Sequence, residues 1–174
     1  TGGGFLPIHF LLKNPNMTAE MVTTMVKAWP KIAKERTPVL KNLGQRETGG
    51  ELLIHLVLKN PNVTAEMVMS IVEVWPDSVK EVTPVLKDSN GIQTGSGELP
   101  IHLLLQNPKV TSEMVTTLVE AWPKSLKEMT PVLKDSNGNQ TGGGELPIHL
   151  LVKNPNVTTE MVTTMVKTCP ESAK

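Results

Sequence analysis

The 174-residue sequence has no tyrosine, two phenylalanines, three tryptophans and a single cysteine, Cys169. Because only one thiol is present, the chain can form neither an internal disulfide nor a cysteine metal cluster, and we interpret Cys169 as a buried thiol. The scarcity of aromatic side chains leaves no platform on which single-stranded bases could stack. Seventeen basic and seventeen acidic residues cancel, so no net field attracts a phosphate backbone or an anionic membrane surface. We therefore expect neither nucleic acid nor a membrane as the partner.

Long apolar segments and targeting signals are also missing. No stretch approaches the roughly 20 apolar residues of a membrane span, and no basic and apolar leader precedes the first unit. The composition is that of a soluble, folded chain, and we expect an intracellular, cytoplasmic location. Since the sequence starts at Thr1 and stops at Lys174 in the middle of a unit, it resembles a piece of a longer array.

The sequence contains one unit that occurs four times in tandem. The string Thr-Gly-Gly-Gly-Phe-Leu-Pro-Ile-His begins at Thr1, and close copies begin at Thr48, Thr94 and Thr141. The units span residues 1–47, 48–93, 94–140 and 141–174, the last being incomplete. A period of this length, with two helical segments per unit, is typical of a solenoid in which each unit buries its apolar face against its neighbours. We predict a single repeat domain of the all-α class.

The sequence of each unit predicts two short helices. Pro100 suits a first helical position, where no N–H is needed, and Pro108 disfavours helical geometry at Asn107, so the first helix has two turns at most. At the start of the second helix, Thr64 is placed as the N-cap, and Glu66 puts negative charge where the helix dipole favours it. The apolar residues that follow recur at offsets of one, three and four, which indicates one buried side. We expect the second helix to end just before the prolines at 30, 76, 123 and 170.

A long connector follows the second helix. The dipeptides Asn90-Gly91 and Asn137-Gly138 favour a type I′ turn, because both central residues of that turn need positive φ. We therefore predict an extended hairpin, or finger, between successive units. The first connector has Asn42-Leu43-Gly44-Gln45 instead, which predicts a different turn. The glycine runs at the base of each finger lack the lysine of a phosphate loop, and we interpret them as hinges.

Four histidines, His9, His55, His102 and His149, occupy one equivalent position in the four units. Stacked helices lie roughly 8 to 10 Å apart, whereas metal bonds to imidazole are only about 2.0 to 2.1 Å long, so one metal ion cannot bridge two units. We interpret the histidines as structural groups, since regular repetition generally serves packing. Catalysis needs unlike groups that converge, and we therefore predict no enzymatic activity, no metal and no cofactor.

The order of glycine, one residue, Leu-Pro-Ile-His, a short helix, a turn, a longer amphipathic helix and a protruding connector resembles the ankyrin repeat, whose hallmark is Gly-x-Thr-Pro-Leu-His. The resemblance covers the whole chain, but leucine takes the threonine position in every unit, and Leu53 replaces the proline in the second unit. The period also exceeds the usual 33 residues. A helical-hairpin solenoid of the HEAT or armadillo kind is the structural alternative, because its period fits better.

The resemblance implies that the four histidines hydrogen-bond backbone between adjacent units. It also implies a protein-protein interaction scaffold, whose fingers and first helices form a concave face that binds another protein. The near identity of the units favours an alternative, a structural spacer or self-associating rod that stacks end to end without one specific ligand. Loops carry function when a rigid scaffold positions them. The residues expected to contact a partner are polar residues of the fingers and the glutamate at the foot of each: Glu51, Lys87, Asp88, Asn90, Glu98, Lys134, Asp135, Asn137 and Glu145.

Overall fold

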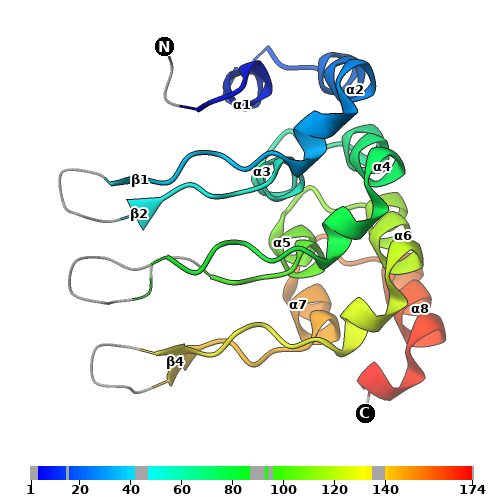
Figure 1. Cartoon of the computed structure of the whole chain (residues 1–174). Helices are drawn as coiled ribbons and strands as arrows, with labels where there is room; N and C mark the ends of the chain where they lie inside the picture. The colour runs from blue at the N-terminus through cyan, green and yellow to red at the C-terminus, as the bar shows by residue number, and fades with distance from the viewer. Residues whose placement is uncertain are drawn as a thin grey trace.

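The computed structural model describes residues 4–14, 16–41, 47–86, 93, 96–134 and 140–173. This part of the chain is mostly helical, in agreement with the all-α prediction, and contains eight α-helices, four 3-10 helices and two two-stranded antiparallel sheets. The odd-numbered and even-numbered α-helices form two rows, and paired extended segments project away from the odd-numbered row (Figure 1).

Two α-helices alternate along the chain. The first helices of the units are α1 (Pro7–Leu11), α3 (Leu53–Lys59), α5 (Pro100–Gln106) and α7 (Pro147–Lys153). The second helices have ten residues each and are α2 (Ala19–Ala28), α4 (Ala65–Val74), α6 (Ser112–Ala121) and α8 (Thr159–Thr168). Each second helix ends two residues before a proline, as the sequence predicts. The predicted threonine caps are also confirmed, because Oγ1 of Thr18, Thr64, Thr111 and Thr158 accepts the backbone N–H three residues later.

A short 3-10 helix, which the sequence did not predict, follows each second helix. These helices are η1 (Pro30–Lys34), η2 (Pro76–Lys80), η3 (Pro123–Lys127) and η4 (Pro170–Ala173). Proline suits the first position because its φ is fixed and its missing N–H is not needed there. The residue before the proline has a ψ of 74 to 85° in all four units and turns the chain out of the α-helix. In consequence η1, η2 and η3 pack against the first helix of the following unit.

The units pack in series around one continuous core. Helices α2, α4, α6 and α8 contact one another in order, and α3, α5 and α7 do the same in the second row. Fully buried residues such as Ile54, Leu58, Ile101 and Leu105 belong to a single cluster to which all four units contribute. Cys169 at the end of α8 is 4% exposed, which confirms the prediction of a buried thiol. Because the apolar surface of one unit is covered by the next, a single unit has no core of its own.

The connectors leave the stack as pairs of extended segments. In the first finger β1 (Leu40–Lys41) pairs with β2 (Glu47–Thr48), and in the third β3 (Leu133–Lys134) pairs with β4 (Gln140–Gly142), both antiparallel. The predicted hairpins are therefore present at these two places. The predicted turns at 42–45, 90–91 and 137–138 lie outside the described residues.

Candidate binding surface between the fingers

A buried threonine closes the base of each finger. Its backbone N–H donates to a glutamate carbonyl oxygen at 2.9 Å, and its hydroxyl accepts the N–H of the same glutamate at 2.8 to 3.0 Å. The pairs are Thr37 with Glu51, Thr83 with Glu98, and Thr130 with Glu145. The glutamate at the foot of each finger therefore has a fixed backbone position.

Two residues before Glu51 and before Glu145 lies a glycine with a positive φ, a backbone conformation that other residues rarely adopt. Gly49 has a φ of 102° and Gly143 a φ of 83°. A Cβ on Gly49 would lie 2.1 Å from the carbonyl oxygen of Pro38, and one on Gly143 would lie 1.8 Å from that of Pro131. These distances are far too short for a carbon and an oxygen that are not bonded. These glycines allow close backbone contact at the base of the finger, and the interpretation of the glycine runs as hinges stays a prediction.

A second set of glycines sets the distance between neighbouring fingers. A Cβ on Gly50 would lie 3.3 Å from Cγ of Pro84 in the next finger, and one on Gly97 would lie 3.3 Å from Cγ of Pro131. The absence of a side chain lets the proline ring approach closely. The fingers are thus held at a regular spacing by glycine and proline contacts.

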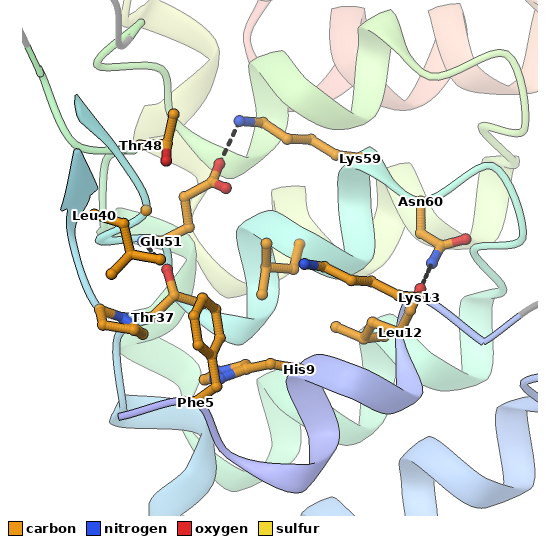
Figure 2. Close-up of a pocket in the computed structure, with 13 residues that line it drawn as sticks. Phe5, His9, Leu12, Lys13, Thr37, Leu40, Thr48, Glu51, Lys59 and Asn60 are labelled. Atoms are coloured by element: carbon orange, nitrogen blue, oxygen red, sulfur yellow. Dashed lines mark hydrogen bonds and ion pairs between the residues drawn. The ribbon is translucent and has the colours of Figure 1, made fainter. Parts of the chain in front are cut away.

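Three hollows lie along the bases of the fingers. The first, of about 330 Å³, lies between α1 and the first finger and is lined by Phe5 and His9 among others (Figure 2). The second and third, of about 250 and 270 Å³, lie between successive fingers. The first and second hollows share Thr48 and Glu51 in their linings, and the second and third share Ser96, so neighbouring hollows adjoin along the finger bases. We call this surface the finger groove: Thr37, Pro38, Leu40, Glu51 and Lys59, then Thr83, Pro84, Leu86, Glu98 and Gln106, then Thr130, Pro131 and Glu145.

Each groove glutamate has a polar partner eight residues later. Glu51 pairs with Lys59 (Figure 2), and Glu145 pairs with Lys153 in the same way. In the unit between them, Oε1 of Glu98 accepts from the Gln106 amide. The side chains of these ion pairs are partly exposed, and exposed pairs contribute little to stability. A partner could therefore replace them at small cost.

Two histidines make both of their ring hydrogen bonds within their own units. Nδ1 of His55 accepts the N–H of Leu52 at 3.2 Å, so Nε2 carries the proton and donates to the Glu81 carbonyl oxygen at 2.8 Å. The same two bonds join His102 to Leu99 and Glu128. The expectation that histidines link adjacent units is wrong, because the 3-10 helix returns the chain so that the carbonyl after it meets the histidine of the same unit.

Burial lowers the pKa of His55 to about 4 and also lowers the pKa of His102. Loss of water around the ring is the main cause for each, and the bond to the glutamate carbonyl opposes it in part. A proton on Nδ1 of His55 would also remove the acceptor of the Leu52 N–H. The unfolded chain, with an ordinary histidine pKa of about 6.5, therefore binds this proton more strongly than the folded chain. The contribution of His55 is fully present above pH 6.5 and is lost as the pH falls towards 4.

We expect the titration of His55 alone to lower the free energy of unfolding by about 3 kcal/mol when the pH falls from 7 to 4. Urea unfolding at a series of pH values measures this loss. The variant His55→Gln should show a flatter pH profile than the original protein. Identical slopes for His55→Gln and the original protein would contradict the prediction.

A row of asparagines joins the units where the first helices end. Nδ2 of Asn107 donates to the carbonyl oxygens of Leu58 and Asn60, at 2.6 and 3.1 Å. Nδ2 of Asn154 donates to those of Leu105 and Asn107 at 2.7 and 3.0 Å, and Nδ2 of Asn60 donates to that of Leu12 at 2.8 Å. In each case Oδ1 accepts the N–H two residues later and closes the turn. Sequence reasoning considered this asparagine only as the place where the first helix ends, although its presence at one position in every unit was a usable signal.

The structure places the expected contact residues unevenly. Glu51, Glu98 and Glu145 line the finger groove, and the backbone of Lys134 lies in β3. Lys87, Asp88, Asn90, Asp135 and Asn137 lie outside the described residues. The sequence-based prediction did not include the apolar finger residues, because it was based on polar side chains only. Leu40 is 46% exposed in the groove, and Val39, Val85 and Val132 recur after the Thr-Pro pair of each finger with 46 to 54% exposure.

Comparison of the chain with protein-family models, curated proteins and solved structures found no match. Within the described ranges, no group of three or more histidine, cysteine, aspartate and glutamate side chains is placed to hold a metal ion. None of the helices in this part of the chain is both long enough and apolar enough to cross a membrane.

Proposed function

We propose that this chain is a protein-protein interaction scaffold of ankyrin-like repeats that binds another protein along the finger groove. The observation that carries the proposal is the recurrence of the groove lining: threonine, proline and glutamate return at equivalent positions beside each finger. Repetition turns separate hollows into one extended surface, which suits a partner that lies across several units. The proposal assigns the chain no reaction and no cofactor.

The chemistry of the groove supports a protein partner. Glu51, Glu98 and Glu145 offer partly exposed carboxylates, while Leu40 and Leu86 offer apolar contact. Protein interfaces combine buried apolar contacts with a polar rim in this way. With equal numbers of acidic and basic residues, the chain gives a nucleic acid no comparable electrostatic attraction.

The rigidity of the finger bases also favours binding. The hydrogen bonds from the buried threonines fix the backbone of each glutamate. The contacts between glycine and proline fix the distance from one finger to the next. A surface that is already ordered loses less conformational entropy when a partner binds. The paired segments between the helical units favour the ankyrin-like interpretation over a plain helical hairpin of the HEAT or armadillo kind.

The test uses a groove variant and a matched variant elsewhere. Leu40→Arg with Leu86→Arg places two cations in the groove, whereas Glu73→Arg places one on the exposed side of α4. For a protein captured by the original chain, we expect the groove variant to raise the Kd at least about tenfold, since buried interface anchors contribute more than 1 kcal/mol each. Glu73→Arg should leave the Kd unchanged. Isothermal titration calorimetry measures both values, and a partner that binds the groove variant with unchanged Kd would refute the proposal.

A further inference from the structure

The glutamates at the feet of the three fingers differ in how their charge is balanced. Glu51 and Glu145 each bind the ammonium of the lysine eight residues later. For Glu98 the residue eight positions later is Gln106, whose neutral amide donates to Oε1 of the glutamate. Glu98 forms no ion pair with any residue of the described ranges. The charge of this glutamate is therefore not balanced inside the groove.

Glu98 lines the third hollow of the finger groove, which has a volume of about 270 Å³ and also contains Glu145. Among the described residues, no lysine or arginine lines this hollow. The second hollow differs, because Lys59 lines it together with Glu51. Lys59 and Glu98 both line a further hollow, but the ammonium of Lys59 is bound to Glu51. The third hollow thus has two carboxylates and, within the described ranges, no cation.

A partner in the groove would remove water from Glu98, which is already partly buried. An ionised carboxylate that loses water without gaining a cation is costly to bury. A lysine or arginine of the partner would offset this cost, and at Glu98 it would displace only a neutral amide. At Glu51 or Glu145 it would have to displace the lysine that is already bound there. The groove therefore favours a cation at its middle glutamate over the two beside it.

We propose that the partner of the finger groove is a protein segment that places a lysine or arginine side chain in the third hollow, on the carboxylate of Glu98. This inference rests on the proposed function, because it names the chemistry of the partner of the same groove. Gln106 determines the preference, since a lysine at this position would neutralise Glu98, as the equivalent lysines neutralise the other two glutamates. A partner with a neutral or acidic side chain at this place leaves the carboxylate unpaired and binds more weakly.

Selection from a library of random peptides displayed on phage tests this inference. We expect the peptides that bind the original chain to share lysine or arginine at one position of a common motif. In a fluorescent synthetic peptide of this kind, replacing that cation by glutamine should raise the Kd for the original chain at least about tenfold, which equals about 1.4 kcal/mol. For the variant Gln106→Lys the same replacement should change the Kd less than about twofold, because the new lysine already neutralises Glu98.

The second unit provides a matched variant. Lys59→Gln gives Glu51 the amide partner that Glu98 has in the original chain, and the exposed ion pair that it removes contributes little to stability. Lys59→Gln combined with Gln106→Lys should move the selected cation to the second hollow. Successive units lie roughly 8 to 10 Å apart, and an extended segment rises about 3.3 Å per residue. The cation should therefore shift by about three positions relative to the rest of the motif.

The outcomes separate this inference from the proposed function. Peptides without a shared cation that lose affinity for Leu40→Arg with Leu86→Arg would overturn the inference alone, because they would still bind the groove. A shared cation that contributes as much on Gln106→Lys as on the original chain would overturn it too, since it would bind elsewhere. Failure to select any peptide would overturn the inference, which requires a segment. Peptides that bind Leu40→Arg with Leu86→Arg at unchanged Kd would contradict the proposed function as well. Thermal unfolding of each variant checks that its fold is intact.

Discussion

Replacing Asn107 by alanine is expected to lower the free energy of unfolding by about 3 kcal/mol. The side chain is 5% exposed and makes three hydrogen bonds, two from Nδ2 to the preceding unit and one from the N–H of Lys109 to Oδ1. Alanine leaves these backbone groups without their partner, and an unsatisfied buried group costs about 1 to 3 kcal/mol. Urea unfolding followed by circular dichroism measures the loss.

The chain provides a matched control for this substitution. Asn14 closes the same turn with the N–H of Asn16 and donates to no unit among the described residues. Asn14→Ala should therefore cost about 1 kcal/mol or less. If both alanine variants lost the same stability, the turn alone would explain the effect, and the row between units would contribute nothing.

Replacing Gly143 by alanine is expected to open the base of the third finger, at a local cost of about 3 kcal/mol. Its φ of 83° is unfavourable for alanine, and the new Cβ would lie 1.8 Å from the Pro131 carbonyl oxygen. The backbone can relieve this overlap only by moving, which breaks the bonds between Thr130 and the backbone of residues 144–145. Hydrogen exchange at the Thr130 and Gly144 amides should become faster, because these N–H groups lose their acceptors.

Gly142→Ala is the control for the glycine substitution. A Cβ on Gly142 would meet nothing within 4 Å, so this variant should stay within about 0.5 kcal/mol of the original protein. Unchanged exchange at Thr130 and Gly144 in Gly143→Ala would show that the finger base tolerates a side chain, contrary to the geometry.

The parts of the fold that local rules govern were predictable from the sequence. Proline positions and threonine caps predicted where the second helices begin and end, because both act through the backbone within one turn. The 3-10 helix escaped prediction, since the proline at its start was considered only as the end of the α-helix. The close approach of Gly49 and Gly143 to a carbonyl oxygen was not predicted, because composition does not reveal a contact with another segment of the same finger.

Contacts between units were harder to predict than elements. The bond from Asn107 to Leu58 joins residues 49 positions apart, and nothing near Asn107 in the sequence indicates it. The resemblance to ankyrin repeats predicted that the histidine joins neighbouring units through hydrogen bonds. In this structure the asparagine makes those bonds. In the candidate site, polarity correctly placed Glu51, Glu98 and Glu145 at the finger bases. It missed Leu40, which is exposed in the groove, since apolar residues were assigned to the core.

The asparagine row has a consequence for how the chain unfolds. Asn107 donates to the unit before it and accepts, through its own carbonyl oxygen, from the unit after it. An interior unit therefore shares hydrogen bonds with two neighbours, while an end unit shares them with one. Stability in such an array is a sum of nearest-neighbour couplings, so fraying should begin at the ends and spread inward, and each added unit should make the whole melt more sharply.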